Sequence, residues 1–148
     1  MCFFIALILD QIIKCVVVAT NSNIPVIPNI FNIMYVQNTG GVYGILEGNN
    51  LLFICISLIV LVLLCVYSKV AVNDDKSKKV LWQLIIAGGT GNLIDRVFRG
   101  FVVDYVQLIF FGVFNLADAF IVISTILIIF LELREFVSGT NRKKDNGK

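Results

Sequence analysis

The stretch GGTGNLIDR, from Gly88 to Arg96, places the ionisable side chain of Asp95 at the end of a long apolar run. On a helix, Gly88, Asn92 and Asp95 share one face, because they are four and three residues apart. Glycines let helices approach closely in lipid, where packing rather than burial from water drives their association. The stretch therefore predicts a helix packed tightly inside a membrane bundle.

The composition is that of a membrane protein. The 148 residues are 58% hydrophobic and only 15% charged, which is unlike a soluble domain. Four segments approach the roughly 17–25 apolar residues needed to cross a bilayer. They are Cys2–Thr20, Leu51–Ser68, Val80–Arg96 and Phe114–Leu133. The third is short, because its apolar part ends at Ile94, so it needs Lys79 and Arg96 as polar ends that reach the interfaces.

Basic residues are distributed unevenly among the connections. Four lysines lie between residues 69 and 79, and five basic residues follow position 133, whereas residues 21–50 contain neither lysine nor arginine. By the positive-inside rule, both termini and the lysine-rich connection are cytoplasmic. We expect a single integral-membrane domain over residues 1–137. A disordered basic cytoplasmic tail is expected over residues 138–148, because its polar composition buries too little surface to offset ordering entropy.

The two outward connections are predicted to lie on the membrane. Ile24–Pro28 and Phe31–Gln37 are β-prone segments broken by proline and asparagine, which predicts a small sheet on the outer surface. The apolar content of Val97–Gly112 favours an amphipathic helix in the interface. The expected fold class is an all-α membrane protein with four transmembrane helices, a small extracytoplasmic β-sheet and a short interfacial helix.

Asp95 and Asp118 are candidates for chemistry inside the membrane. An ionisable side chain at bilayer depth costs about 2.5–3.5 kcal/mol, so it needs a partner or a function. Asp95 ends an outward-going helix and Asp118, in FNLADAF, begins an inward-going one, so both lie near the outer face. Two carboxyls in one poorly solvated site tend to share a proton, so one can activate water while the other polarises a carbonyl. The alternative is structural: each aspartate caps a helix or pairs with Arg96 or Arg99.

Other polar residues leave two interpretations open. Asp10 and Lys14 are four residues apart, which predicts either an ion pair within the first span or contacts to neighbouring helices or a substrate. Asp104 is predicted either to orient Arg96 or Arg99 or to be solvated in a loop. Asn38 precedes Thr39 and two glycines, which is typical of a turn. Histidine is absent and the four cysteines form no CxxC pair, so no metal site and no cofactor are expected.

Five motifs occur in order between positions 9 and 121. They are LDQIIK (Leu9–Lys14), NTGGVYG (Asn38–Gly44), GGTGNLIDR (Gly88–Arg96), VVDYV (Val102–Val106) and FNLADAFI (Phe114–Ile121). In this order and spacing they closely resemble the lipoprotein signal peptidases of bacteria, also called signal peptidase II. The resemblance implies an intramembrane aspartic endopeptidase that removes the signal peptide from prolipoproteins, cutting just before a cysteine that carries a diacylglyceryl group.

The resemblance also implies the site residues. It implies that Asp95 and Asp118 form the catalytic dyad. Positions that the family uses around its site are matched by Asp10, Lys14, Asn38, Gly40, Asn92, Arg96, Asp104, Asn115 and Ala117. The chain departs from the family pattern at Ile13 and at Gly41–Tyr43, and the second departure affects contacts that the outer loop would make with substrate.

The implied partners are a prolipoprotein with a diacylglyceryl-cysteine and membrane lipids, and no nucleic acid is expected. The protein is expected to be a monomer and to be inhibited by globomycin. The implied location is the bacterial cytoplasmic (inner) membrane, crossed several times, with the active site near the outer face. Residue patterns alone leave two other classes open: a small proton-coupled transporter or channel subunit with aspartate relays, and a membrane scaffold whose polar residues hold helices together. The first predicts solute flux without cleavage, and the second predicts that aspartate changes damage folding.

Overall fold

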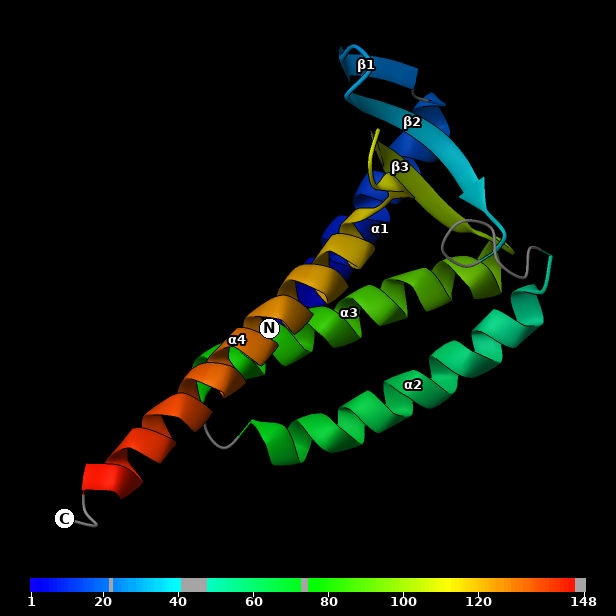
Figure 1. The fold of residues 1–148 in the computed structure, drawn as a ribbon. Helices are drawn as coiled ribbons and strands as arrows, with labels where there is room; N and C mark the ends of the chain where they lie inside the picture. The colour runs from blue at the N-terminus through cyan, green and yellow to red at the C-terminus, as the bar shows by residue number, and fades with distance from the viewer. Residues whose placement is uncertain (22, 41–47, 73–74, 146–148) are drawn as a thin grey trace.

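The computed structural model describes residues 1–21, 23–40, 48–72 and 75–145, with side chains as far as Ser138. The helices are α1 (Cys2–Thr20), α2 (Asn50–Ala71), α3 (Lys76–Phe98) and α4 (Leu116–Asp145). The strands are β1 (Asn23–Ile27), β2 (Phe31–Asn38), β3 (Val102–Leu108) and β4 (Gly112–Phe114). The sheet lies across one end of the helices (Figure 1). The predicted combination of four helices and a small sheet is confirmed.

Helix α3 is the centre of the bundle, because it packs against α1, α2 and α4. A Cβ atom at Gly88 would collide with the carbonyl oxygen of Ala117 on α4, and one at Gly91 would lie 2.5 Å from Oδ2 of Asp10 on α1. Only glycine permits such approaches without displacing a neighbour. The glycines of the GGTGNL segment therefore set the spacing of α3 from α1 and α4.

Helix α3 is also the least apolar of the four. Within the described residues, α1, α2 and residues 116–138 of α4 are long and apolar enough to cross a membrane, and α3 falls below that threshold. The reason is its central position, since neighbouring helices rather than lipid surround its polar residues. Helix α2 is the opposite case: none of its residues is buried, and it lies at the edge of the bundle (Figure 1).

The four strands form one antiparallel sheet in the order β1-β2-β3-β4. The strands predicted at Ile24–Pro28 and Phe31–Gln37 are confirmed as β1 and β2. The interfacial helix expected within Val97–Gly112 is wrong, because this connection forms β3 and the start of β4. Valine and tyrosine favour a strand, and β2 offers a paired partner for nearly the whole length of β3.

Helix α4 continues through Asp145, beyond Ser138, where the sequence predicts a disordered tail to begin. No proline interrupts this segment, so nothing removes a helical hydrogen bond there.

A small apolar core fastens the sheet to α1. It consists of Val17 on α1 with Val103 and Tyr105 on β3. Side chains alternate across a strand, so Asp104 points to the opposite face from Val103 and Tyr105. The core thereby holds β3 with Val103 and Tyr105 toward α1 and the carboxyl of Asp104 on the opposite face.

The glycine spacing can be tested with two neighbouring substitutions. We expect Gly88→Ala to destabilise the protein by about 2 kcal/mol, because the new Cβ meets the α4 backbone at Ala117. Gly89→Ala is the matched control, since its Cβ meets only the flexible end of the Leu61 side chain. Thermal unfolding of both variants in detergent measures the difference. Equal stability of the two variants would contradict a backbone contact at Gly88.

Candidate active site

A cavity of about 870 Å³ lies where the sheet meets α3 and α4. Its wall is mainly apolar and comes from β2, β3, β4 and the first turns of α4. The polar side chains that reach it include Asn38, Asn92, Arg96, Asp104 and Asp118. An apolar hollow with a few convergent polar groups is the usual form of a ligand site.

Asp104 and Asp118 are joined through a single residue, Asn115. The side-chain Nδ2 of Asn115 donates to Oδ1 of Asp104 at 2.7 Å, and its backbone N–H donates to Oδ2 of Asp118 at 3.1 Å. Asn115 is completely buried, so these bonds are shielded from competing water. One asparagine thus fixes the position of both carboxyls at the cavity wall.

The start of α4 positions Asp118. The backbone N–H of Asp118 donates to Oδ1 of Asn115 at 3.0 Å, while Oδ2 of Asp118 accepts from the backbone N–H of Asn115. This reciprocal pair three residues apart is a capping box, which satisfies otherwise unpaired donors at a helix N-terminus. The expectation that Asp118 has a helix-terminal role is confirmed, and Oδ1 of Asp118 is left to face Asn92.

Asn92 on α3 presents its amide nitrogen to Asp118. Its Oδ1 accepts from Nζ of Lys14 at 2.9 Å and from Nδ2 of Asn115 at 3.1 Å. Both of these groups can only donate, so the amide oxygen must face them. The NH₂ group therefore points to Oδ1 of Asp118, to which it donates at 2.7 Å.

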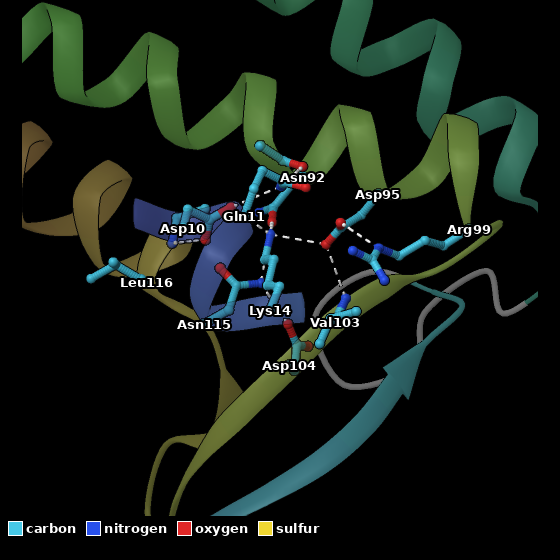
Figure 2. A network of polar contacts seen from close by, with 12 residues as sticks. Asp10, Gln11, Lys14, Asn92, Asp95, Arg99, Val103, Asp104, Asn115 and Leu116 are labelled. Carbon is cyan, nitrogen blue, oxygen red and sulfur yellow. Dashed lines mark hydrogen bonds and ion pairs between the residues drawn. The ribbon is translucent and has the colours of Figure 1, made fainter. Parts of the chain in front are cut away.

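Lys14 is the centre of a buried ion-pair network (Figure 2). Its Nζ lies 2.9 Å from Asp10 Oδ2 and 2.9 Å from Asp95 Oδ2. The ion pair predicted between Asp10 and Lys14 is confirmed, and Lys14 also reaches a neighbouring helix. Asp95 receives further bonds from Nε of Arg99 at 3.2 Å and from the backbone N–H of Val103 at 3.2 Å. Two cations and two anions thus balance inside the bundle.

The structure does not bring Asp95 into the cavity. Its carboxylate is completely buried and accepts from Lys14, Arg99 and the N–H of Val103. Neither Asp95 nor these partners are among the described residues that line the hollow. In this geometry Asp95 does not join Asp118 at the cavity wall, where the expected pair would have to meet. The structural alternative, in which Asp95 pairs with an arginine, fits the contacts with Arg99. The carboxyl beside Asp118 is that of Asp104.

Arg96 and Asn38 close the outer side of the site. Nη2 of Arg96 donates to the carbonyl oxygen of Gly40 at 3.0 Å, and its guanidinium lies 4.8 Å from the ring centre of Phe53. Asn38 donates from Nδ2 to Oδ2 of Asp104 at 2.9 Å, and its Oδ1 accepts from the N–H of Gly40. The turn expected at Asn38 is therefore combined with a direct contact to Asp104. The Gly41–Gly44 part of the second motif lies outside the described residues.

The remaining candidates hold the helices together beneath the cavity. The backbone N–H of Ala117 donates to Oδ1 of Asp10 at 3.1 Å, which ties α4 to α1. Two further contributors were not predicted as site residues. Gln11 donates to the carbonyl oxygen of Gly91 at 3.2 Å, and the hydroxyl oxygen of Tyr105 accepts from the N–H of Leu116 at 3.1 Å. Both lie inside the recognised motifs LDQIIK and VVDYV, which is the signal that points to them.

Burial controls the protonation of Asp104, which lies on β3 outside the membrane-spanning helices. Loss of solvent raises the pKa of Asp104 to about 6. The hydrogen bond from Asn38 lowers this pKa, and the nearby charge of Asp118 raises it. A carboxyl with such a pKa can hold a proton close to neutral pH. The cavity thus contains an acid suited to proton transfer beside a second carboxyl.

Comparison with known proteins gives consistent matches along most of the chain. The family profile described as Signal peptidase (SPase) II matches residues 2–134. The lipoprotein signal peptidase of Halothermothrix orenii is 40% identical over 128 residues, covering 84% of this chain and 88% of that protein. The lipoprotein signal peptidase of Streptococcus pneumoniae is 37% identical over 139 residues, covering 88% and 89%.

Solved structures agree with the sequence matches. A bacterial membrane enzyme determined by the in meso method superposes with a TM-score of 0.83 at 34% identity, covering 91% of this chain and 87% of that chain. A second such structure gives a TM-score of 0.78 at 34% identity, covering 89% and 90%. The likeness therefore extends over the helices and the sheet together.

The protonation of Asp104 makes a prediction about stability. Its pKa is about 6 in the folded protein against 3.8 in the unfolded chain, so the folded state binds the proton more tightly. Relative to Asp104→Asn, the wild-type protein should lose about 2–3 kcal/mol as pH rises from about 4 to about 6, and then level off. Unfolding temperatures of both proteins across this range measure the difference. A difference that does not vary with pH would contradict the raised pKa.

Proposed function

This chain belongs to the signal peptidase II family, and we propose that Asp104 and Asp118 are the two carboxyls that carry out its reaction. The protein is a multi-pass bacterial membrane enzyme. It is an aspartic peptidase, a lipoprotein signal peptidase that removes the signal peptides of prolipoproteins.

One observation carries the assignment of the carboxyls. Asp104 and Asp118 are the only acidic side chains among the described residues that line the cavity. They come from β3 and from the first turn of α4, and Asn115 bonds to both. Asp95 is engaged by Lys14 and Arg99 instead, so its oxygens are already committed to cations.

The proposed mechanism is general acid–base catalysis by this pair. One carboxyl is ionised and takes a proton from a water molecule held between the two, while the other is protonated and donates to the carbonyl oxygen of the scissile bond. The water oxygen bonds to the carbonyl carbon, and collapse of the tetrahedral intermediate breaks the C–N bond as the amine accepts a proton from the pair. The pKa of about 6 lets Asp104 hold a proton before water attacks. The protonation steps nevertheless belong to the pair as a unit.

The apolar wall of the cavity suits a lipid-bearing substrate. Leu108, Val113 and Phe114 line one side, and Ile121 and Val122 line another. We infer that the acyl chains of a diacylglyceryl-cysteine lie against this wall, which brings the bond just before that cysteine to the carboxyls. The distribution of lysine and arginine supports cytoplasmic termini. The sheet and cavity would then face the outer side of the bacterial inner membrane, with the protein acting as a monomer.

The carboxyl assignment is tested by three matched amide substitutions. We expect Asp104→Asn and Asp118→Asn each to lower kcat on the order of 10³-fold without unfolding the protein, because each removes one proton-transfer group. We expect Asp95→Asn to lower the free energy of unfolding by about 3 kcal/mol, because it leaves Lys14 and Arg99 poorly compensated. Its folded fraction should still cleave. Cleavage of a purified lipidated precursor and circular dichroism measure the two effects. An inactive but stable Asp95→Asn together with an active Asp104→Asn would reverse the assignment.

Substrate specificity gives a separate test. The protein should cleave a precursor carrying diacylglyceryl-cysteine and leave the unlipidated precursor intact, since the apolar wall contributes binding only when acyl chains are present. Globomycin should inhibit the reaction. Equal cleavage of both precursors would contradict the lipid requirement, and solute flux in liposomes without any cleavage would favour a transporter instead.

A further inference from the structure

Two neighbouring hairpin turns form an exposed apolar surface at the end of the sheet, here called the sheet tip. It consists of Val26, Ile27, Ile30, Ile109, Phe110 and Phe111. The two turns are joined, because the backbone N–H of Ile109 donates to the carbonyl oxygen of Ile30 at 3.2 Å. Phe110 is 87% exposed and Phe111 is 72% exposed. The tip is therefore one continuous apolar feature.

The turn geometry does not explain these apolar residues. In the β1–β2 turn, the N–H of Ile30 donates to the carbonyl oxygen of Ile27, with Pro28 and Asn29 at the central positions and Asn29 at φ +62°. This is a type II arrangement, determined by the proline and the asparagine. Turns are usually polar. The turn geometry therefore does not explain why isoleucine stands on both sides of this turn, at Ile27 and Ile30.

The β3–β4 turn gives the same result. The N–H of Phe111 donates to the carbonyl oxygen of Leu108 at 3.0 Å, and Gly112 follows with φ +77°. A glycine in this conformation completes a short hairpin loop, and polar residues would fit the two central positions equally well. Ile109 and Phe110 nevertheless occupy them. An isolated exposed apolar residue is ordinary, but a cluster of them marks an interaction surface.

We propose that the sheet tip inserts into the outer leaflet of the lipid bilayer. The occupant is lipid because the tip continues the apolar lipid-facing surfaces of the helices: Val16 near the outer end of α1 and Val122 and Ile123 near the outer end of α4 are each more than half exposed. The segments that form the tip are uncharged, since residues 15–46 and 105–117 contain no Lys, Arg, Asp or Glu. Aromatic and aliphatic side chains without charge partition into the interface.

The tip also leads into the cavity. Phe111 belongs both to the tip and to the cavity wall, together with Leu108 and Gly112 on either side of the turn. An inserted tip would provide an uninterrupted apolar path from the outer leaflet to the hollow that contains Asp104 and Asp118. This part rests on the proposed function, because it requires a substrate that carries acyl chains. The tip would then lower KM for such a substrate without changing the chemical step.

Insertion is tested without any cleavage assay. The protein has one tryptophan, Trp82, so Phe110→Trp adds a single reporter at the tip and the parent protein gives the background. In vesicles of phosphatidylcholine brominated along the acyl chains, the added fluorescence should be quenched by about half or more. Added fluorescence that is not quenched would overturn the proposal. Unquenched fluorescence together with a dimeric mass would assign the tip to a second copy of the chain.

Kinetics provide the second measurement. The double variant Ile109→Ser/Phe110→Ser should raise KM for a lipidated precursor in vesicles by about fivefold or more, with kcat unchanged. The control is Ile24→Ser, which removes an exposed apolar side chain of β1 outside the tip and should leave KM as it is. A fall in kcat with KM unchanged would point to a structural role and overturn the proposal. If no variant cleaves, the quenching result still decides insertion independently of the proposed function.

Discussion

The buried ammonium group of Lys14 is the interaction on which the rest of the structure depends. It compensates Asp10 on its own helix and Asp95 on α3, and a carboxylate left without such a partner in a bundle interior is strongly destabilising. Asp95 in turn accepts the N–H of Val103, next to Asp104 on β3. The same ammonium group orients Asn92, which bonds to Asp118. One positive charge therefore positions both carboxyls of the cavity through two separate routes.

This network depends on close contact between helices. Gly91 leaves room for the carboxylate of Asp10, and Gly88 lets the α4 backbone approach at Ala117. Ala117 donates its N–H back to Asp10, so the glycine contacts and the ion pairs reinforce each other. Because packing rather than hydrophobic burial holds helices together in lipid, a polar centre enclosed by glycines is a stable solution. This polar centre explains why α3, the helix with the lowest hydropathy, lies in the middle of the bundle.

Residue patterns predicted the helices and strands better than they predicted the arrangement of the site. Helical periodicity placed Gly88, Asn92 and Asp95 on one face of α3, and residue spacing anticipated the Asp10–Lys14 pair. Periodicity describes a single element, so it could not tell which carboxyl of another element reaches Asp118. Asp104 lies at the same cavity wall because β3 pairs with the distant β2 and turns Val103 and Tyr105 toward α1. The prediction of an interfacial helix within Val97–Gly112 was wrong for the same reason. The strand β3 forms there instead, and it depends on pairing with β2, which is distant in the sequence.

Helix α2 differs from its neighbours in having no buried residue. Its specific contacts lie at its two ends: at the outer end Asn50 donates to the backbone oxygen of Arg96 and Phe53 faces the guanidinium of Arg96. At the inner end the ring of Tyr67 packs edge-on against Trp82 of α3. Along the rest of this helix, natural selection would act on average hydropathy rather than on shape. Most of its positions should therefore drift freely among leucine, isoleucine and valine over evolutionary time, while α3 would be held nearly invariant.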